Sequence, residues 1–207
     1  MDRKFLVIIA VLVLGFIGLV FFQRNNQPAV EAIRSNNVYG NLNSKVTLTE
    51  FLDFQCEACY AFYPTIEKVK ETYKDRVKFQ TKYFPLGGGH QYSRLTASYA
   101  EAAARQGKFF EMQAKLFQNQ KIWEVGNTQE YMDKYAQEIG LDMNKVRADV
   151  KSASVNDTIN ADLQEARDID ATGTPTFVLN NNKIDNPANT YEAFAKLLDD
   201  ALAKAGN

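Results

Sequence analysis

The stretch Glu50-Phe51-Leu52-Asp53-Phe54-Gln55-Cys56-Glu57-Ala58-Cys59-Tyr60 decides the fold. An apolar run ends in two cysteines separated by two residues, and the apolar spacing after them predicts a helix at once. They are the only cysteines among 207 residues. At a helix start, unpaired backbone N–H groups and the positive end of the helix dipole favour the thiolate of Cys56, which is the reactive form. We therefore predict that the chain presents Cys56 to other thiols.

Other interpretations of the cysteine pair are weaker. A structural disulfide with a two-residue spacer closes too small a loop to stabilise much. A zinc site needs four ligands, and the single histidine, His90, would add at most one to the two cysteines, so we expect no metal site. We predict that His90 lies in a turn or helix cap. A copper-binding module using Cys56 and Cys59 as soft thiolate ligands is a rival from another class. No Met-rich or His-rich loop accompanies the pair, and no cofactor is expected.

The segments around the cysteines predict an α/β fold. Residues 46–54 are rich in β-branched and aromatic side chains, as in a central strand buried on both faces. Residues 57–73 carry apolar side chains at helical spacing, and residues 77–84 alternate between apolar and polar, which predicts a half-exposed strand. Strand, helix and strand within about 40 residues form a βαβ unit.

The rest of the chain extends this unit. Helical patterns fill residues 90–170 or thereabouts, and a strand pattern resumes at residues 174–179. A turn at Asn180-Asn181-Asn182, a short strand at Lys183-Ile184 and a last helix follow. We therefore expect one α/β domain over residues 38–207 with a helical insertion.

The N-terminus predicts a membrane anchor. Residues 5–22 are uncharged, which exceeds the usual core of a signal peptide and approaches the length of a spanning helix. Two basic residues precede the span and one follows it closely, so the N-terminus is expected in the cytoplasm. We predict a single-pass signal-anchor over residues 1–24, a linker over residues 25–37, and a domain on the extracytoplasmic side of the cell membrane. A cleaved signal peptide is the alternative.

Composition and charge narrow the function classes. The chain is 45% apolar and 24% charged, a globular mixture. Its formal net charge is −1 and its Lys and Arg residues are scattered singly, which excludes a basic footprint for nucleic acid. An extracytoplasmic compartment is oxidising, so a disulfide can be a stable resting state there.

Three motifs that lie far apart carry a family resemblance. The first is Phe51-x-Asp53-Phe54-Gln55-Cys56-x-x-Cys59. The second is Tyr83-Phe84-Pro85-Leu86 with the later His90, an Ala-rich segment and Gln106-Gly107-Lys108-Phe109-Phe110. The third is Gly173-Thr174-Pro175-Thr176. From about Asn37 to the C-terminus, the sequence resembles the DsbA-like thiol–disulfide oxidoreductases of the thioredoxin superfamily. The resemblance implies a thioredoxin fold (βαβ…ββα) with an inserted helical domain at about residues 90–170.

The resemblance also implies roles for single residues. Cys56 would be the nucleophile and Cys59 the buried resolving thiol, and the two would form the redox-active disulfide. Pro175 would be cis and would place Thr174 beside Cys56, where both could bind substrate. Glu50 matches the superfamily's buried acid, for which the physical rationale is proton exchange with Cys59, since a desolvated carboxyl has a raised pKa. A glutamate at a strand edge is the alternative for Glu50.

The implied activity is a disulfide oxidase for unfolded exported proteins. A quinone-linked membrane partner of the DsbB or vitamin K epoxide reductase type would reoxidise it. A reductase or isomerase is the alternative within the class. Known bacterial isomerases carry an N-terminal dimerisation domain, for which the linker is too short, so a monomer is expected. The spacer Glu57-Ala58 is neither the Pro-His of strong oxidants nor the Gly-Pro of thioredoxins. We expect a weaker oxidant than the Pro-His members because Glu57 opposes a nearby thiolate.

Overall fold

The computed structural model describes residues 9, 13–16, 18 and 34–206. The chain divides into two compact units, residues 1–32 and residues 33–207. Within the described ranges, none of the helices has the length and apolar character needed to cross a membrane. Most of the anchor predicted over residues 1–24, and most of the predicted linker, lies outside the described residues. The anchor therefore stays a prediction.

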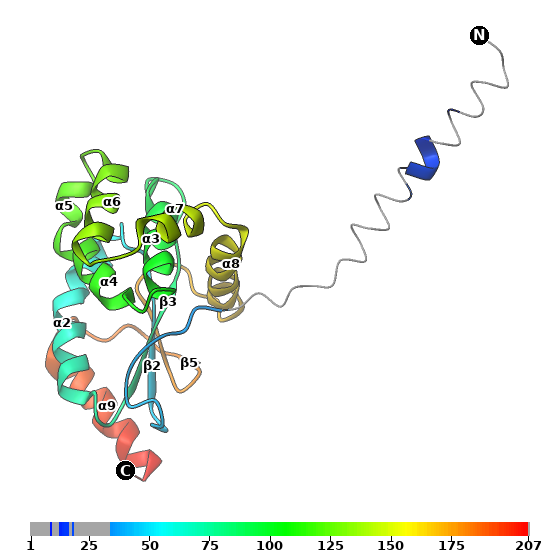
Figure 1. The fold of residues 1–207 in the computed structure, drawn as a ribbon. Helices are drawn as coiled ribbons and strands as arrows, with labels where there is room; N and C mark the ends of the chain where they lie inside the picture. Colours follow the sequence, from blue (N-terminus) through cyan, green and yellow to red (C-terminus); the bar gives the residue numbers. More distant parts are fainter. Residues whose placement is uncertain (1–8, 10–12, 17, 19–33, 207) are drawn as a thin grey trace. The chain divides into compact units, whose positions relative to one another are not determined.

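One mixed sheet organises the second unit (Figure 1), with the strand order β1-β3-β2-β4-β5. Its strands are β1 (Asn37–Gly40), β2 (Thr47–Leu52), β3 (Lys78–Tyr83), β4 (Thr176–Leu179) and β5 (Asn182–Lys183). β2 runs parallel to β3 and antiparallel to β4. The apolar run before the cysteines is therefore the central strand, as its composition predicted.

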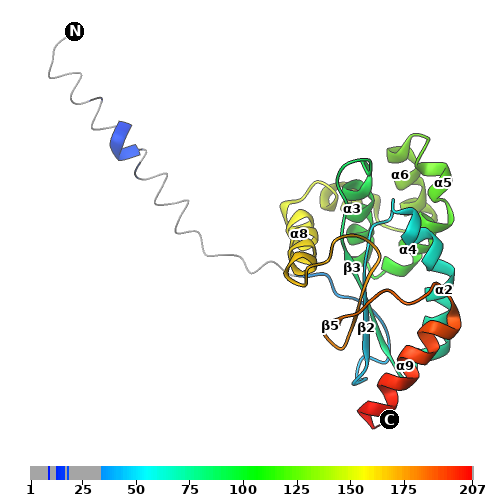
Figure 2. The same cartoon turned by 180° about the vertical axis from the view of Figure 1, so that it is seen from behind.

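Helices cover both faces of the sheet and one of its ends (Figures 1 and 2). They are α2 (Glu57–Tyr73), α3 (Ser93–Ala104), α4 (Phe109–Gln118), α5 (Gln120–Trp123), α6 (Thr128–Glu138), α7 (Met143–Asp149), α8 (Ala153–Asp168) and α9 (Tyr191–Ala205). Val69 of α2 and Leu198 of α9 belong to one buried cluster with strand residues of one face. Ala166 of α8 packs with Phe51 and Val178 on the other face.

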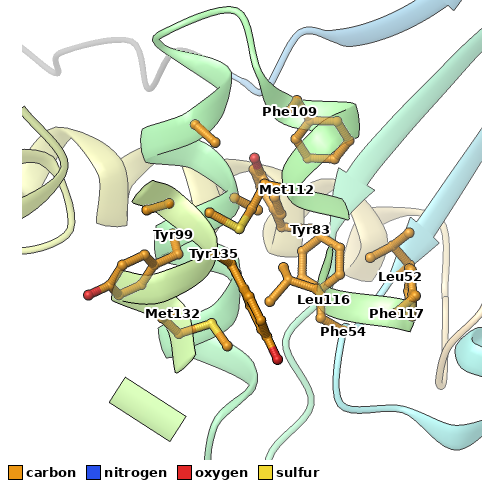
Figure 3. Packing of buried hydrophobic residues seen from close by; sticks show 14 of the residues in the cluster. Leu52, Phe54, Tyr83, Tyr99, Phe109, Met112, Leu116, Phe117, Met132 and Tyr135 are labelled. Atoms are coloured by element: carbon orange, nitrogen blue, oxygen red, sulfur yellow. The ribbon is translucent and has the colours of Figure 1, made fainter. Parts of the chain in front are cut away.

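The helical insertion has a core of buried apolar side chains (Figure 3). Its buried side chains include Met112 and Leu116 of α4, and they pack with Leu52 and Tyr83, the last residues of β2 and β3. Both cysteines belong to this same cluster. The insertion therefore covers the end of the sheet at which the Cys-x-x-Cys motif begins.

Two segments differ from the expectation. β3 was predicted to be half exposed, but the Lys82 side chain is only 6% exposed because it forms an ion pair with Glu165 of α8. Asn37 was expected to end the linker, but it begins β1. Ser35 is also buried, and its backbone N–H donates to Asp162 Oδ1 at 3.2 Å. The first difference comes from Glu165 of α8. The second comes from the pairing of β1 with β3, and Asp162 of α8 holds the segment just before β1.

Candidate active site

The two cysteines occupy different environments at the start of α2. Cys56 is the N-cap residue of α2, with an extended backbone (φ −73°, ψ 125°). Cys59 lies inside the first turn, and both cysteines are free thiols. Cys59 is 0% exposed, whereas Cys56 is 6% exposed. Cys56 is therefore the sulfur that another molecule can reach.

These different environments give the two thiols different pKa values. The pKa of Cys56 is lowered to about 5, chiefly by a hydrogen bond from the Cys59 side chain. Thr174 and the backbone N–H groups of Cys59 and Ala58 lower it further, against the opposing effect of burial. Burial raises the pKa of Cys59 well above its usual value, and hydrogen bonding to Cys56 and the charge of Glu50 add to this. At neutral pH the pair therefore holds one thiolate, on Cys56, and one thiol, on Cys59.

The segment before β4 brings Thr174 to Cys56 from 118 residues away in the sequence. When it is protonated, the Cys56 thiol donates to the carbonyl oxygen of Thr174 at 3.3 Å. The Thr174–Pro175 peptide bond is cis, as the resemblance implied. The Thr174 hydroxyl oxygen is buried and has no hydrogen-bond partner within the described part of the chain. It can therefore donate to the Cys56 sulfur once that sulfur has lost its proton.

Glu50 is a buried acid in the central strand. Burial raises its pKa from 4.5 to about 7; the positive charge of Lys70 acts against this rise, and the charge of Glu67 adds to it. Lys70 is itself buried on α2, where its Nζ lies 2.9 Å from Glu67 Oε1. The charge of Glu50 in turn raises the pKa of Cys59. The protonation of Glu50 and that of Cys59 are therefore coupled.

The connection between β2 and α2 is tied to the connection between β3 and α3. Asp53 accepts hydrogen bonds from the backbone N–H groups of Gln55 at 2.8 Å and Leu86 at 2.9 Å, and from Ser93 Oγ at 2.6 Å. Gln55 Oε1 accepts from the backbone N–H of Tyr92 at 2.8 Å. These bonds hold the residues just before Cys56 in place.

His90 and Glu57 lie near the site without contacting either sulfur by a hydrogen bond. The His90 carbonyl oxygen accepts from the Ser93 N–H at 3.3 Å, which places His90 in the expected turn. Its Nδ1 lies 3.3 Å from Asp53 Oδ2. Glu57 is exposed, and its charge is not among the main causes of the low Cys56 pKa. The structure therefore gives no support to Glu57 as a reason for a weaker oxidant.

Sequence reasoning missed Gln120. Its side chain is 0% exposed, and its Nε2 donates to the carbonyl oxygens of Phe54 at 2.9 Å and Cys56 at 3.2 Å. A signal was present, because Leu116, Gln120 and Trp123 share a helical spacing of four and three residues. Both apolar members are fully buried. A glutamine at such an inward position needs a polar partner.

The family of the chain follows from its match to a family model. The model described as thioredoxin matches residues 34–200, which include all five strands, the helices α2 to α8 and most of α9. The chain belongs to the thioredoxin family. This thioredoxin-family chain is similar to the thiol-disulfide exchange protein alpha-DsbA2 of Wolbachia pipientis, with 22% identity and a TM-score of 0.69. The likeness covers 80% of this chain and 86% of that one.

Two further similarities concern proteins with other descriptions. A periplasmic thioredoxin-like protein of Salmonella enterica serovar Typhimurium is 26% identical, with a TM-score of 0.61, over 81% of this thioredoxin-family chain and 90% of that one. The Na(+)/H(+) antiporter NhaA 1 of Mycobacterium sp. (strain KMS) is 32% identical over 154 residues, 73% of this chain. The chain spans only 24% of that antiporter's length, so the antiport activity in the name describes that longer protein.

Proposed function

We propose that the chain is an extracytoplasmic, DsbA-like protein disulfide oxidoreductase that introduces disulfides into unfolded exported proteins. One observation carries this proposal: the site lowers the pKa of Cys56 to about 5 while it raises that of Cys59. A stabilised thiolate makes the dithiol form more stable relative to the disulfide. The disulfide form is then easily reduced, which makes it an oxidant of other thiols.

The proposed reaction begins from the Cys56–Cys59 disulfide. A substrate thiolate attacks Cys56 Sγ, the bond to Cys59 breaks, and Cys59 leaves with the electron pair. Because the pKa of Cys59 is high, its sulfur takes up a proton, for which the neutral carboxyl of Glu50 is the donor. The second thiolate of the substrate then attacks the substrate sulfur of the mixed disulfide, and Cys56 leaves as a thiolate. Two electrons have passed from the substrate dithiol to the enzyme.

A cleft at the Thr174–Pro175 segment suits an extended substrate chain. It measures about 320 Å³ and is lined by residues 170–176 and 183–186. Thr174 and Pro175 form part of its wall, and the carbonyl oxygen of Thr174 already contacts Cys56. Backbone groups recognise an extended chain of any sequence by main-chain hydrogen bonds, which fits a range of unfolded substrates.

The location and the reoxidising partner belong to the same proposal. Reduced enzyme must pass two electrons onward, and we assign this step to a quinone-linked membrane protein of the DsbB or vitamin K epoxide reductase type. A single-pass anchor at residues 1–24 would hold the enzyme near that partner. The description of the Salmonella relative as periplasmic supports an oxidising, extracytoplasmic setting.

The direction of transfer tests the proposal. The full-length chain in mild detergent, oxidised beforehand, is mixed with an equal amount of a reduced, unfolded protein that holds two thiols. We expect one substrate disulfide to form for each enzyme disulfide lost, counted by mass spectrometry after acid quenching and alkylation. A Cys56→Ser chain serves as the control and should transfer nothing. The proposal fails if the substrate stays reduced, or if the reduced enzyme instead reduces the oxidised substrate to completion.

A further inference from the structure

The side chain of Gln120 joins the helical insertion to the backbone on both sides of Cys56. It is the first residue of the short helix α5, and it comes 64 residues after Cys56 in the sequence. Its Nε2 lies 2.9 Å from the carbonyl oxygen of Phe54 and 3.2 Å from that of Cys56. Both contacts are acceptors, so the amide nitrogen must face them and the orientation of the amide follows from its neighbours.

The amide of Gln120 uses its nitrogen but leaves its oxygen unpaired. Its Oε1 is buried and finds no hydrogen-bond partner among the described residues. A buried acceptor without a partner costs free energy, whereas the side chains around it, such as Leu116 and Trp123, are apolar and fully buried. A leucine of similar size would avoid that cost, but it would leave the Phe54 carbonyl oxygen without this donor. The two carbonyl contacts are therefore the feature that requires an amide at this position.

These two carbonyl groups lie at the point where the chain enters α2. The Cys56 carbonyl also accepts the helical hydrogen bond from the N–H of Tyr60 at 3.0 Å. The following N–H groups, of Ala58 and Cys59, are those that stabilise the Cys56 thiolate. Their direction depends on how the peptide units before them are oriented.

We propose that Gln120 is a positioning residue that holds the backbone around Cys56, so that the helical insertion sets how oxidising the disulfide is. The inference rests on the proposed function, because it concerns the strength of the same dithiol. Gln120 does not touch the reacting sulfur. It acts by holding the Phe54 and Cys56 carbonyl groups, and this keeps the N–H groups in the first turn of α2 directed toward the sulfur.

A titration of Cys56 in two variants tests this role. Gln120→Leu keeps the size of the side chain and removes the donor, whereas Gln120→Glu keeps its shape but, once ionised, opposes both carbonyl oxygens. The full-length chain is titrated by thiolate absorbance at 240 nm, and because the chain has only two cysteines the low-pH step belongs to Cys56. We expect both variants to lower the thiolate-to-thiol ratio of Cys56 at pH 6 by about threefold to tenfold. The equilibrium constant with glutathione should shift toward the disulfide form.

A matched control separates positioning from general destabilisation. Thr128 lies in the same insertion, where its buried hydroxyl donates to the carbonyl oxygen of Trp123 at 2.8 Å rather than to a group of the cysteine loop. Thr128→Val should lower the midpoint of urea unfolding but leave the Cys56 titration unchanged. If Gln120→Leu and Gln120→Glu titrate like the wild type, the inference is overturned, even if both are less stable. Failure of the proposed function would appear instead in the wild-type chain, as an absence of disulfide transfer.

Discussion

A Cys59→Ser chain is expected to trap substrates on Cys56 as long-lived mixed disulfides. Cys56 keeps a thiolate-favouring site at the start of α2, so it still attacks a disulfide presented to it. Without Cys59 the Cys56–Cys59 disulfide cannot form, and no internal thiol can displace a substrate held on Cys56, so turnover should fall to the uncatalysed rate. Non-reducing electrophoresis of cell extracts, followed by mass spectrometry, would detect the adducts at Cys56.

The Cys56→Ser variant is the control for this trapping experiment. Cys56→Ser leaves only Cys59, which is 0% exposed and has a raised pKa, so it should form almost no adducts. Equal trapping by the two variants would contradict the assignment of Cys56 as the sulfur that meets the substrate.

Glu50→Gln is expected to stabilise the reduced protein strongly at neutral and higher pH. The folded state raises the pKa of Glu50 from 4.5 to about 7, so the native carboxyl holds its proton over a range in which the unfolded one has lost it. By linkage, the free energy of unfolding falls as the pH rises from the lower value through the upper one. The loss amounts to about 3 kcal/mol at about 1.4 kcal/mol per pKa unit.

Glutamine does not ionise, so the variant should lack this pH-dependent loss. In urea unfolding of the reduced chains, the variant and the wild type should have nearly equal free energies of unfolding at pH 4. At pH 8 the variant should be more stable than the wild type by about 3 kcal/mol. Glu57→Gln removes an exposed carboxylate from the first turn of α2 and should show no such difference. A stability gap between Glu50→Gln and wild type that is the same at both pH values would refute the raised pKa.

The same substitution should slow disulfide transfer. Without the Glu50 carboxyl, Cys59 must exchange its proton with water in a buried site, and we expect a loss on the order of 10²-fold in the rate of the attack that displaces Cys59. Stopped-flow tryptophan fluorescence could follow the reaction, because Trp123 belongs to the same buried cluster as both cysteines. If the variant and the wild type react at the same rate from pH 5 to 9, Glu50 takes no part in the proton transfer.

Local sequence patterns predicted the parts of this site that depend on neighbouring residues. The apolar run before Cys56 indicated the central strand, and the two-residue spacing indicated the helix start. The Thr-Pro segment was placed beside Cys56 only through the family resemblance, because 118 residues separate the two. The spacing of apolar residues does not predict which distant side chain binds a given carbonyl group.

The residues that were missed are polar side chains whose partners are far away in the sequence. Lys82 alternates correctly for an exposed position, but Glu165 of α8 covers it. Gln120 stands at an inward helical position, which marks it as a buried polar group without saying what it binds. Such pairs depend on how the helical insertion docks on the sheet, and that docking is a property of the whole packed domain.

The reduction potential of the Cys56–Cys59 pair tests the central claim most directly. The full-length chain in mild detergent is equilibrated with glutathione buffers of known ratio, and the fraction of disulfide is measured after acid quenching. The stabilised Cys56 thiolate predicts a potential above roughly −200 mV, in the range of oxidants. A value near that of thioredoxin, about −270 mV, would contradict the account and would make the protein a reductant.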